Sequence, residues 1–166
     1  MPSRFIDAEG FSCDILEFIS LLKKHGVRYV IVGGEAVIYH GYARVTGDVD
    51  FFYEPAPKNA HRLFACLLGF WRGRIPGVKT AAELNEPGII LQFGRPPHRI
   101  DLMNIIDGVL FPDAWKSRLR VQLKSARGDV PAYYIGLRPL LKNKLASGRL
   151  QDLLDSSFLQ RKLKAR

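Results

Sequence analysis

The segment from residue 28 to residue 54 constrains the fold most, because it holds two short apolar runs separated by a Gly-Gly pair. The run RYVIVG, residues 28–33, is rich in β-branched and aromatic residues and ends at glycine, which predicts a buried strand. Residues 35–41 predict a short helix, and DVDFFYE, residues 48–54, predicts a second strand. Each of these elements has an apolar side to bury, so together they require a sheet with helices packed on it.

The rest of the chain predicts further helices and strands around this unit. Helical spacing of apolar residues predicts the helices, and short β-rich runs bounded by glycine or proline predict the strands. In chain order we expect a helix at 14–25, a helix at 58–68, a loop at 71–87 with a helical turn at 81–84, strands at 88–94 and 98–105, a helix at 111–118, strands at 120–125 and 130–136, and a helical segment from 137 to the end, divided at Gly148.

The order of these elements bounds the fold class. Strands and helices do not alternate regularly enough for a doubly wound parallel sheet, so we expect an α/β (α+β) architecture with helices flanking a mixed sheet. The chain has 166 residues, 47% of them hydrophobic, which is enough to bury one core. We therefore expect a single domain, with a core over 1–136 and a C-terminal helical segment over 137–166 packed on it.

Composition argues against several classes of protein. No apolar run is long enough to span a membrane, and MPSRFIDAEGFSCDI at the N-terminus lacks the features of a signal peptide. The two cysteines, Cys13 and Cys66, lack the spacing of a zinc site, so we expect free thiols and a cytoplasmic protein. The net charge of +9 predicts a basic surface that attracts polyanions, nucleic acid first.

Three aspartates lie on the predicted strands, where a cation would stabilise their negative charges. Asp48 and Asp50 share one strand face because strand side chains alternate, and their charges repel by about 4 kcal/mol at an effective dielectric constant of about 20. Asp101 lies inside the apolar run RIDLM, where an unpaired acid would be costly. The alternatives are a fully solvated face for the pair and an ion pair between Asp101 and Arg95 or Arg99.

A turn suited to phosphate precedes these acids. Gly33 and Gly34 lie between a strand and a helix, where glycine allows a close backbone approach and exposes helix N-terminal amides. Arg44 and Thr46, just before the acids, could also contact phosphate, although a loop arginine and a turn threonine explain them too. Three strand carboxylates beside such a turn are what two Mg²⁺ ions need to assist phosphoryl transfer.

The segment VGGEAVIYHGYARVTGDVDFF resembles the signature of the nucleotidyltransferase superfamily, whose fold is like that of DNA polymerase β. That signature is an apolar strand, Gly-Gly or Gly-Ser, a spacer of about a dozen residues, and Asp-x-Asp before an apolar residue; Asp101 falls where the superfamily carries its third acid. The segments PPHRIDLM, DGVLFPDAW and LLKNKLASGRLQDLLD are similar to later blocks of small bacterial nucleotidyltransferases of the AbiEii toxin-like kind. The resemblance covers roughly residues 26–158.

The resemblance implies transfer of a nucleotidyl group from a nucleoside triphosphate to an acceptor hydroxyl, with Mg²⁺ or Mn²⁺ as cofactor. It implies that Asp48 and Asp50 hold the metals, and that Asp101 serves the metal nearer the nucleophile and helps to draw its proton. It also implies that Gly33 and Gly34 receive the triphosphate and that Lys144, in the C-terminal helical block, faces it. With Arg44 and Thr46, these are the expected phosphate-binding residues. Lys144 could instead be a solvated helix lysine, and Asp152 and Asp155 could pair with it or with Arg149.

RNA, such as a tRNA end, is the acceptor that the basic surface and the resemblance favour. In the toxin setting, the resemblance implies an antitoxin protein as a partner. Two alternatives belong to other classes. One is an enzyme that modifies a small antibiotic-like molecule, and the other is a non-catalytic module of the same fold that binds nucleotide or RNA. The presence of all three acids argues against the non-catalytic module.

Overall fold

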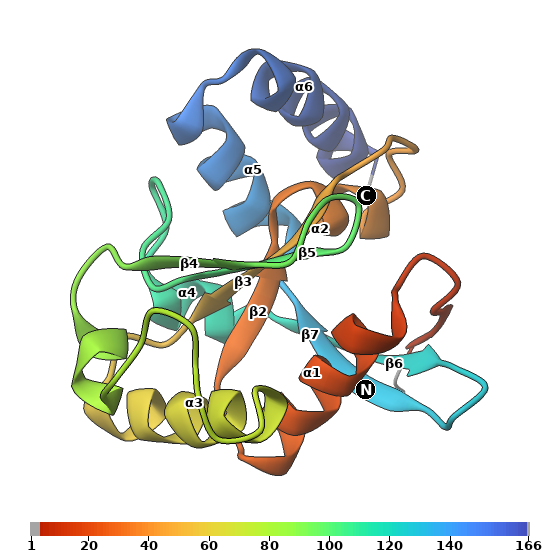
Figure 1. The fold of residues 1–166 in the computed structure, drawn as a ribbon. Coiled ribbons are helices and arrows are strands. Elements are labelled where there is room, and N and C mark those ends of the chain that lie inside the picture. The colour runs from red at the N-terminus through yellow and green to blue at the C-terminus, as the bar shows by residue number, and fades with distance from the viewer. Residues whose placement is uncertain (1–3, 166) are drawn as a thin grey trace.

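The computed structural model describes residues 4–165, and the strands of that range form one mixed sheet (Figure 1). The sheet order is β1-β6-β7-β2-β3-β5-β4. The strands are β1 (Arg4–Asp7), β2 (Tyr29–Val32), β3 (Asp48–Tyr53), β4 (Ile90–Phe93), β5 (Arg99–Met103), β6 (Leu119–Lys124) and β7 (Val130–Tyr134). Parallel pairs, among them β3 with β5, alternate with antiparallel pairs such as β2 with β3, which confirms the expected mixed α/β fold class.

Helices cover both faces of this sheet. They are α1 (Cys13–Lys24), α2 (Gly33–Tyr39), α3 (Pro57–Phe70), α4 (Phe111–Lys116), α5 (Leu137–Ser147) and α6 (Leu150–Lys164), with a 3₁₀ turn, η1 (Ala81–Asn85). In Figure 1, α1 and α3 lie on one side of the sheet, and α5 and α6 stand on the other side. No helix within residues 4–165 combines the length and the apolar composition that a membrane span requires.

The central strand β3 shows why the sequence forms these layers. Its alternate side chains point to opposite faces. Phe51 packs edge-on against Phe18 of α1 at 5.3 Å, and the Tyr53 hydroxyl donates to the Leu84 carbonyl of η1. On the other face, Phe52 meets Phe111 of α4 at 5.2 Å. Because both faces are covered, β3 is buried on either side over its second half, while its first half carries Asp48 and Asp50.

Most expected elements are present, with shifts at their ends. The runs at 88–94 and 98–105 form the antiparallel pair β4–β5, and the runs at 120–125 and 130–136 form the antiparallel pair β6–β7. Gly148 takes a left-handed conformation and ends α5, so it divides the C-terminal helices as expected. The strand β1 was not expected, because a four-residue edge strand carrying Arg and Asp leaves little pattern to read.

The C-terminal helices pack against each other and reach back to the loop after α2. Tyr42 stacks on Phe158 of α6 with ring centroids 4.8 Å apart, and the Lys162 ammonium donates to the His40 carbonyl. This loop, residues 40–47, leads directly into β3 and its acids. The C-terminal helices therefore contact the segment that positions Asp48 and Asp50.

Candidate metal centre

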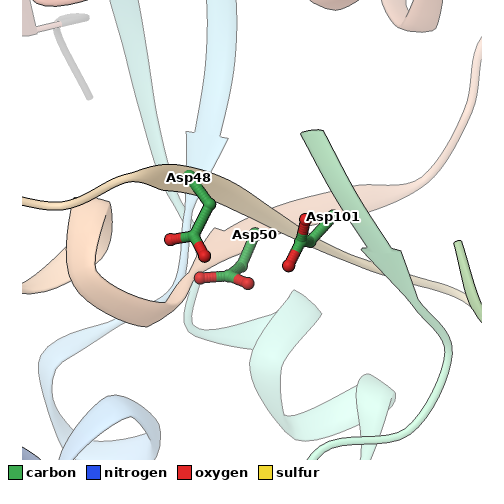
Figure 2. A group of neighbouring side chains, drawn as sticks. All are labelled: Asp48, Asp50 and Asp101. Carbon is green, nitrogen blue, oxygen red and sulfur yellow. The ribbon is translucent and has the colours of Figure 1, made fainter. Parts of the chain in front are cut away.

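Asp48, Asp50 and Asp101 come together on one face of the sheet, as Figure 2 shows. In the parallel register of β3 and β5, Asp50 lies opposite Asp101, and Asp48 lies opposite Arg99. One oxygen atom from each of the three carboxylates lies within 4.8 Å of the others. Two residues from β3 and one from β5, 51 positions after Asp50 in the sequence, thus form a group that could hold a metal ion.

Asp50 is the member of this group whose charge is least compensated. Its pKa is raised to about 7, first by burial and then by the neighbouring carboxylates of Asp48 and Asp101. Among residues 4–165, no side chain donates a hydrogen bond to its carboxylate, and the cations Lys144 and Arg149 act on it only at longer range. A cation bound at this point would offset the cost of ionising Asp50.

Arg99 supplies positive charge to the other two acids. Its Nη2 lies 2.7 Å from Oδ2 of Asp48, and its Nε lies 2.7 Å from Oδ1 of Asp101. The amide of Gln92 on β4 donates a further hydrogen bond of 3.0 Å to Asp101. The predicted alternative of an ion pair for Asp101 is therefore confirmed for Arg99, and that arginine also reaches Asp48. The alternative of a fully solvated face for Asp48 and Asp50 is wrong, because both residues are only partly exposed and burial raises the pKa of Asp50.

The three acids fit a hard divalent cation by donor type and number. Carboxylate oxygens are the ligands that Mg²⁺ and Mn²⁺ prefer, and three of them exceed the single positive charge of Arg99. The Arg99 side chain is 28% exposed, so it can move aside or share the carboxylates when a cation binds. The donor set and the excess negative charge therefore agree with a metal centre that Arg99 partly neutralises.

Packing in the fold explains why glycine is required at positions 33 and 34, which the sequence alone does not reveal. Gly33 has a φ of +63°, and a Cβ atom there would collide with the Asp50 carboxylate. A Cβ atom on Gly34 would lie 2.7 Å from Oγ1 of Thr46 and 2.8 Å from Nη2 of Arg44. Glycine is therefore needed at both positions, because the backbone there lies too close to Asp50, Thr46 and Arg44 to leave room for a side chain.

Thr46 and Arg44 hold positions beside this turn. The Thr46 hydroxyl donates to Oδ1 of Asp48 at 3.1 Å, so it orients one of the acids. Arg44 donates through Nη2 to Oδ2 of Asp155 at 3.1 Å, and its Nε lies 3.1 Å from the other oxygen of that carboxylate. Arg44 is thus more than the plain loop arginine of the alternative interpretation, because it connects the loop before β3 to α6.

Lys144 is buried, so the alternative of a solvated helix lysine is wrong. Its Nζ lies 2.7 Å from Asp152 and 3.0 Å from Asp155, both of which are themselves buried. Arg149 pairs with Asp152 at 2.8 Å while its own side chain stays 77% exposed. The expected pairing of Asp152 and Asp155 with these cations is confirmed, and Arg149 is the cation of this cluster with the most freedom to reach a ligand.

All eight predicted site residues line one cleft of about 660 Å³. They are Gly33, Gly34, Arg44, Thr46, Asp48, Asp50, Asp101 and Lys144. The sequence analysis did not assign Gln92, Asp107, Asn143, Ser147 and Gln151 to the site, although the structure brings them to the same cleft. An isolated polar residue matches no sequence motif. Of these five residues, only Gln92 had a possible signal, because it pairs with Asp101 across neighbouring strands.

No model of a known protein family matches the chain, and no curated protein matches it either.

Proposed function

We propose that this protein is a metal-dependent nucleotidyltransferase, with Mg²⁺ or Mn²⁺ as the cofactor. The observation that carries the proposal is the acidic group of Asp48, Asp50 and Asp101 packed directly against the Gly33–Gly34 turn in one cleft. Two close metal ions on such carboxylates can neutralise charge on a transferring phosphoryl group and orient both the attacking and the leaving oxygen. The resemblance of the same segments to nucleotidyltransferases supports this assignment.

The charge of the cleft supports a ligand set of metal and polyphosphate together. Five carboxylates and four cationic side chains line it, so its formal charge is −1 when all are ionised. A triphosphate alone would meet net repulsion there, whereas divalent cations on the three acids would make the cleft positive. The nucleotide is therefore expected to bind as its metal complex.

The proposed reaction joins an acceptor hydroxyl to the α-phosphorus of a nucleoside triphosphate. A bond forms between the hydroxyl oxygen and that phosphorus, and the bond from the phosphorus to the oxygen bridging to the β-phosphate breaks. Pyrophosphate leaves with the electron pair of that bond, and the hydroxyl proton passes to Asp101 and then to water. The products are the nucleotidylated acceptor and pyrophosphate, so the step needs no other reactant.

Neighbouring residues serve this chemistry by position and charge. Thr46 orients Asp48 through its hydrogen bond, and the glycines allow the Asp50 carboxylate and the Thr46 hydroxyl to pack directly against the turn. Arg149, exposed at the rim of the cleft, can contact phosphate oxygens directly. Lys144 contributes its charge from a buried position and holds Asp152, which in turn holds Arg149.

RNA, such as a tRNA end, is the proposed acceptor. The cleft is slightly acidic while the whole chain carries +9, so the excess positive charge lies on the surface outside the cleft. Such a surface attracts a polyanionic acceptor. An antitoxin protein that restrains the enzyme is the proposed partner, and this rests on the resemblance alone.

Label transfer tests the function. The purified protein is incubated with Mg²⁺ or Mn²⁺, each α-labelled nucleoside triphosphate in turn, and either total bacterial RNA or total protein. The variant Asp48→Asn/Asp50→Asn runs in parallel, and Asp129→Asn, an exposed acid outside the cleft, serves as the matched control. Label on RNA that depends on the two acids and survives in the control is the expected result.

Other outcomes separate the alternatives. Label on protein, or on an added aminoglycoside, would replace RNA with another acceptor. Binding of the metal–nucleotide complex without any transfer would favour the non-catalytic module. Absence of both transfer and nucleotide binding would overturn the enzymatic assignment.

A further inference from the structure

Part of the cleft lining is apolar, in contrast to the acids and cations elsewhere in the lining. Ile90 on β4, Met103 on β5, and Ile105 and Ile106 just after β5 form this apolar wall. Ile90 and Met103 are direct partners in the antiparallel register of β4 and β5, so their side chains share a face. The wall is therefore continuous across the two strands that also carry Gln92 and Asp101.

Two members of the wall are unusually open to solvent. Ile90 is 61% exposed and Ile105 is 55% exposed, although both are large apolar side chains at the edge of a charged cleft. Single exposed apolar residues are common, but two in the lining of one concave site indicate a surface that a ligand covers. Polar residues would be expected at this place if the cleft received only metal ions and phosphates.

The wall stands at a fixed distance from the acids. Ile90 and Met103 lie two positions along their strands from Gln92 and Asp101, and side chains two apart point to the same face. Two strand residues span about 6.6 Å. A ligand whose phosphates lie at the acids would therefore reach the wall across a spacer of about one sugar ring.

We propose that the wall formed by Ile90, Met103, Ile105 and Ile106 binds the flat face of the nucleobase of the triphosphate substrate. The proposal rests on the proposed function and adds a subsite to it. A nucleobase presents an apolar π-face that packs on aliphatic side chains, and the ribose supplies the spacer between base and α-phosphate. Burial of the open faces of Ile90 and Ile105 would then contribute affinity in proportion to the apolar area covered.

Calorimetry with two kinds of probe tests this subsite. The protein is titrated in Mg²⁺ with each of the four nucleoside triphosphates and with inorganic tripolyphosphate, which has no base or sugar. The variant Ile90→Ser/Ile105→Ser is compared with Leu154→Ser, an equally open leucine of α6 that does not line the cleft. We expect the wall variant to bind nucleotides about tenfold more weakly, with tripolyphosphate affinity unchanged and the control like the unmodified protein.

Each other result is informative. Unchanged nucleotide affinity in the wall variant, or an equal loss for nucleotides and tripolyphosphate, would overturn the proposal. So would nucleotides that bind the unmodified protein no more tightly than tripolyphosphate does. A protein that binds neither probe would instead refute the proposed function, because the phosphate site itself would then be missing.

Discussion

At the scale of single residues, Arg99 partly neutralises the acidic group of Asp48, Asp50 and Asp101 when no metal is bound. Its guanidinium bridges Asp48 and Asp101, which come from different strands. A divalent cation bound to the same carboxylates would compete with it, because like charges repel at this distance. Arg99 therefore stabilises the metal-free protein and opposes the metal.

We predict that Arg99→Gln lowers the melting temperature of the metal-free protein by about 2–4 °C, which corresponds to about 1 kcal/mol for a partly exposed ion pair. Added Mg²⁺ should then raise the melting temperature more in the variant than in the unmodified protein. Thermal unfolding in chelator and in Mg²⁺ measures both effects. Arg95→Gln, in the exposed turn of the same hairpin, is the control, and an identical Mg²⁺ effect in all three proteins would contradict the prediction.

Asp50 gives the metal-free protein a pH-dependent stability. Its pKa of about 7 in the folded state lies above the ordinary aspartate value of 3.8, so the folded state holds the proton more tightly than the unfolded state does. This contribution to stability is fully present below pH 3.8 and is lost as the pH rises through about 7. Between about pH 5.5 and about pH 8, the metal-free protein should therefore lose more stability than the Asp50→Asn variant does.

Urea unfolding of both proteins in chelator at the two pH values measures this difference. Mg²⁺ at the higher pH should recover the loss in the unmodified protein and have little effect on Asp50→Asn. A difference between the two proteins that does not vary with pH would show that Asp50 is ionised freely in the folded state.

At the scale of elements, the helices α5 and α6 are joined to the loop before β3 by buried charges. Asp155 of α6 is fully buried and pairs with both Lys144 of α5 and Arg44 of the loop. Loss of one partner from a buried ion pair leaves the other charge uncompensated. This cluster therefore connects the C-terminal helices to the segment that positions Asp48.

We expect Asp155→Asn to destabilise the protein by about 3 kcal/mol, because Lys144 and Arg44 lose a shared buried carboxylate. Asp129→Asn, an exposed change of the same kind, should cost about 0.5 kcal/mol or less. Denaturant titration gives both values. Equal small losses would mean that the cluster contributes little beyond packing.

The two cysteines report on separate elements. Cys13, at the start of α1, is exposed, whereas Cys66 in α3 is buried and its burial raises its pKa to about 12. A thiol reagent should therefore modify Cys13 of the native protein quickly and Cys66 only after α3 opens. Stopped-flow labelling with the Cys13→Ser variant isolates the slow reaction. Fast labelling of Cys66 would indicate that α3 detaches readily from the sheet.

At the scale of the whole molecule, the distribution of charge separates the cleft from the rest of the surface. The cleft has a formal charge of −1 while the chain carries +9. Contacts to an RNA acceptor should then depend on the outer surface, with the metal centre adding little affinity.

We predict that total tRNA binds with an affinity that falls about tenfold or more between 50 and 200 mM salt, as counterion release requires. The Asp48→Asn/Asp50→Asn variant should bind it as well as the unmodified protein does, in chelator or in Mg²⁺. A filter-binding assay measures this. Salt-independent binding would argue against RNA as the acceptor.

The sequence by itself determined the features that depend on local spacing. Alternation along DVDFFYE places Asp48 and Asp50 on one face in any sheet, since side chains of a strand repeat every two residues. Apolar periodicity and the positions of glycine and proline likewise predicted most helices, the four strands that form β4, β5, β6 and β7, and the break at Gly148. An acid inside the apolar run RIDLM singled out Asp101, and the resemblance of the later segments added Lys144 to the expected site.

Only the tertiary structure decided how these pieces meet. The parallel register of β3 and β5 sets Asp101 opposite Asp50 and Arg99 opposite Asp48, and no local pattern fixes the pairing of strands so far apart in sequence. The burial of Lys144 between Asp152 and Asp155, and the apolar wall beside Gln92, also depend on elements that come together only in the fold. Local spacing sets which side chains share a face, whereas long-range packing sets which faces meet and which charges are buried.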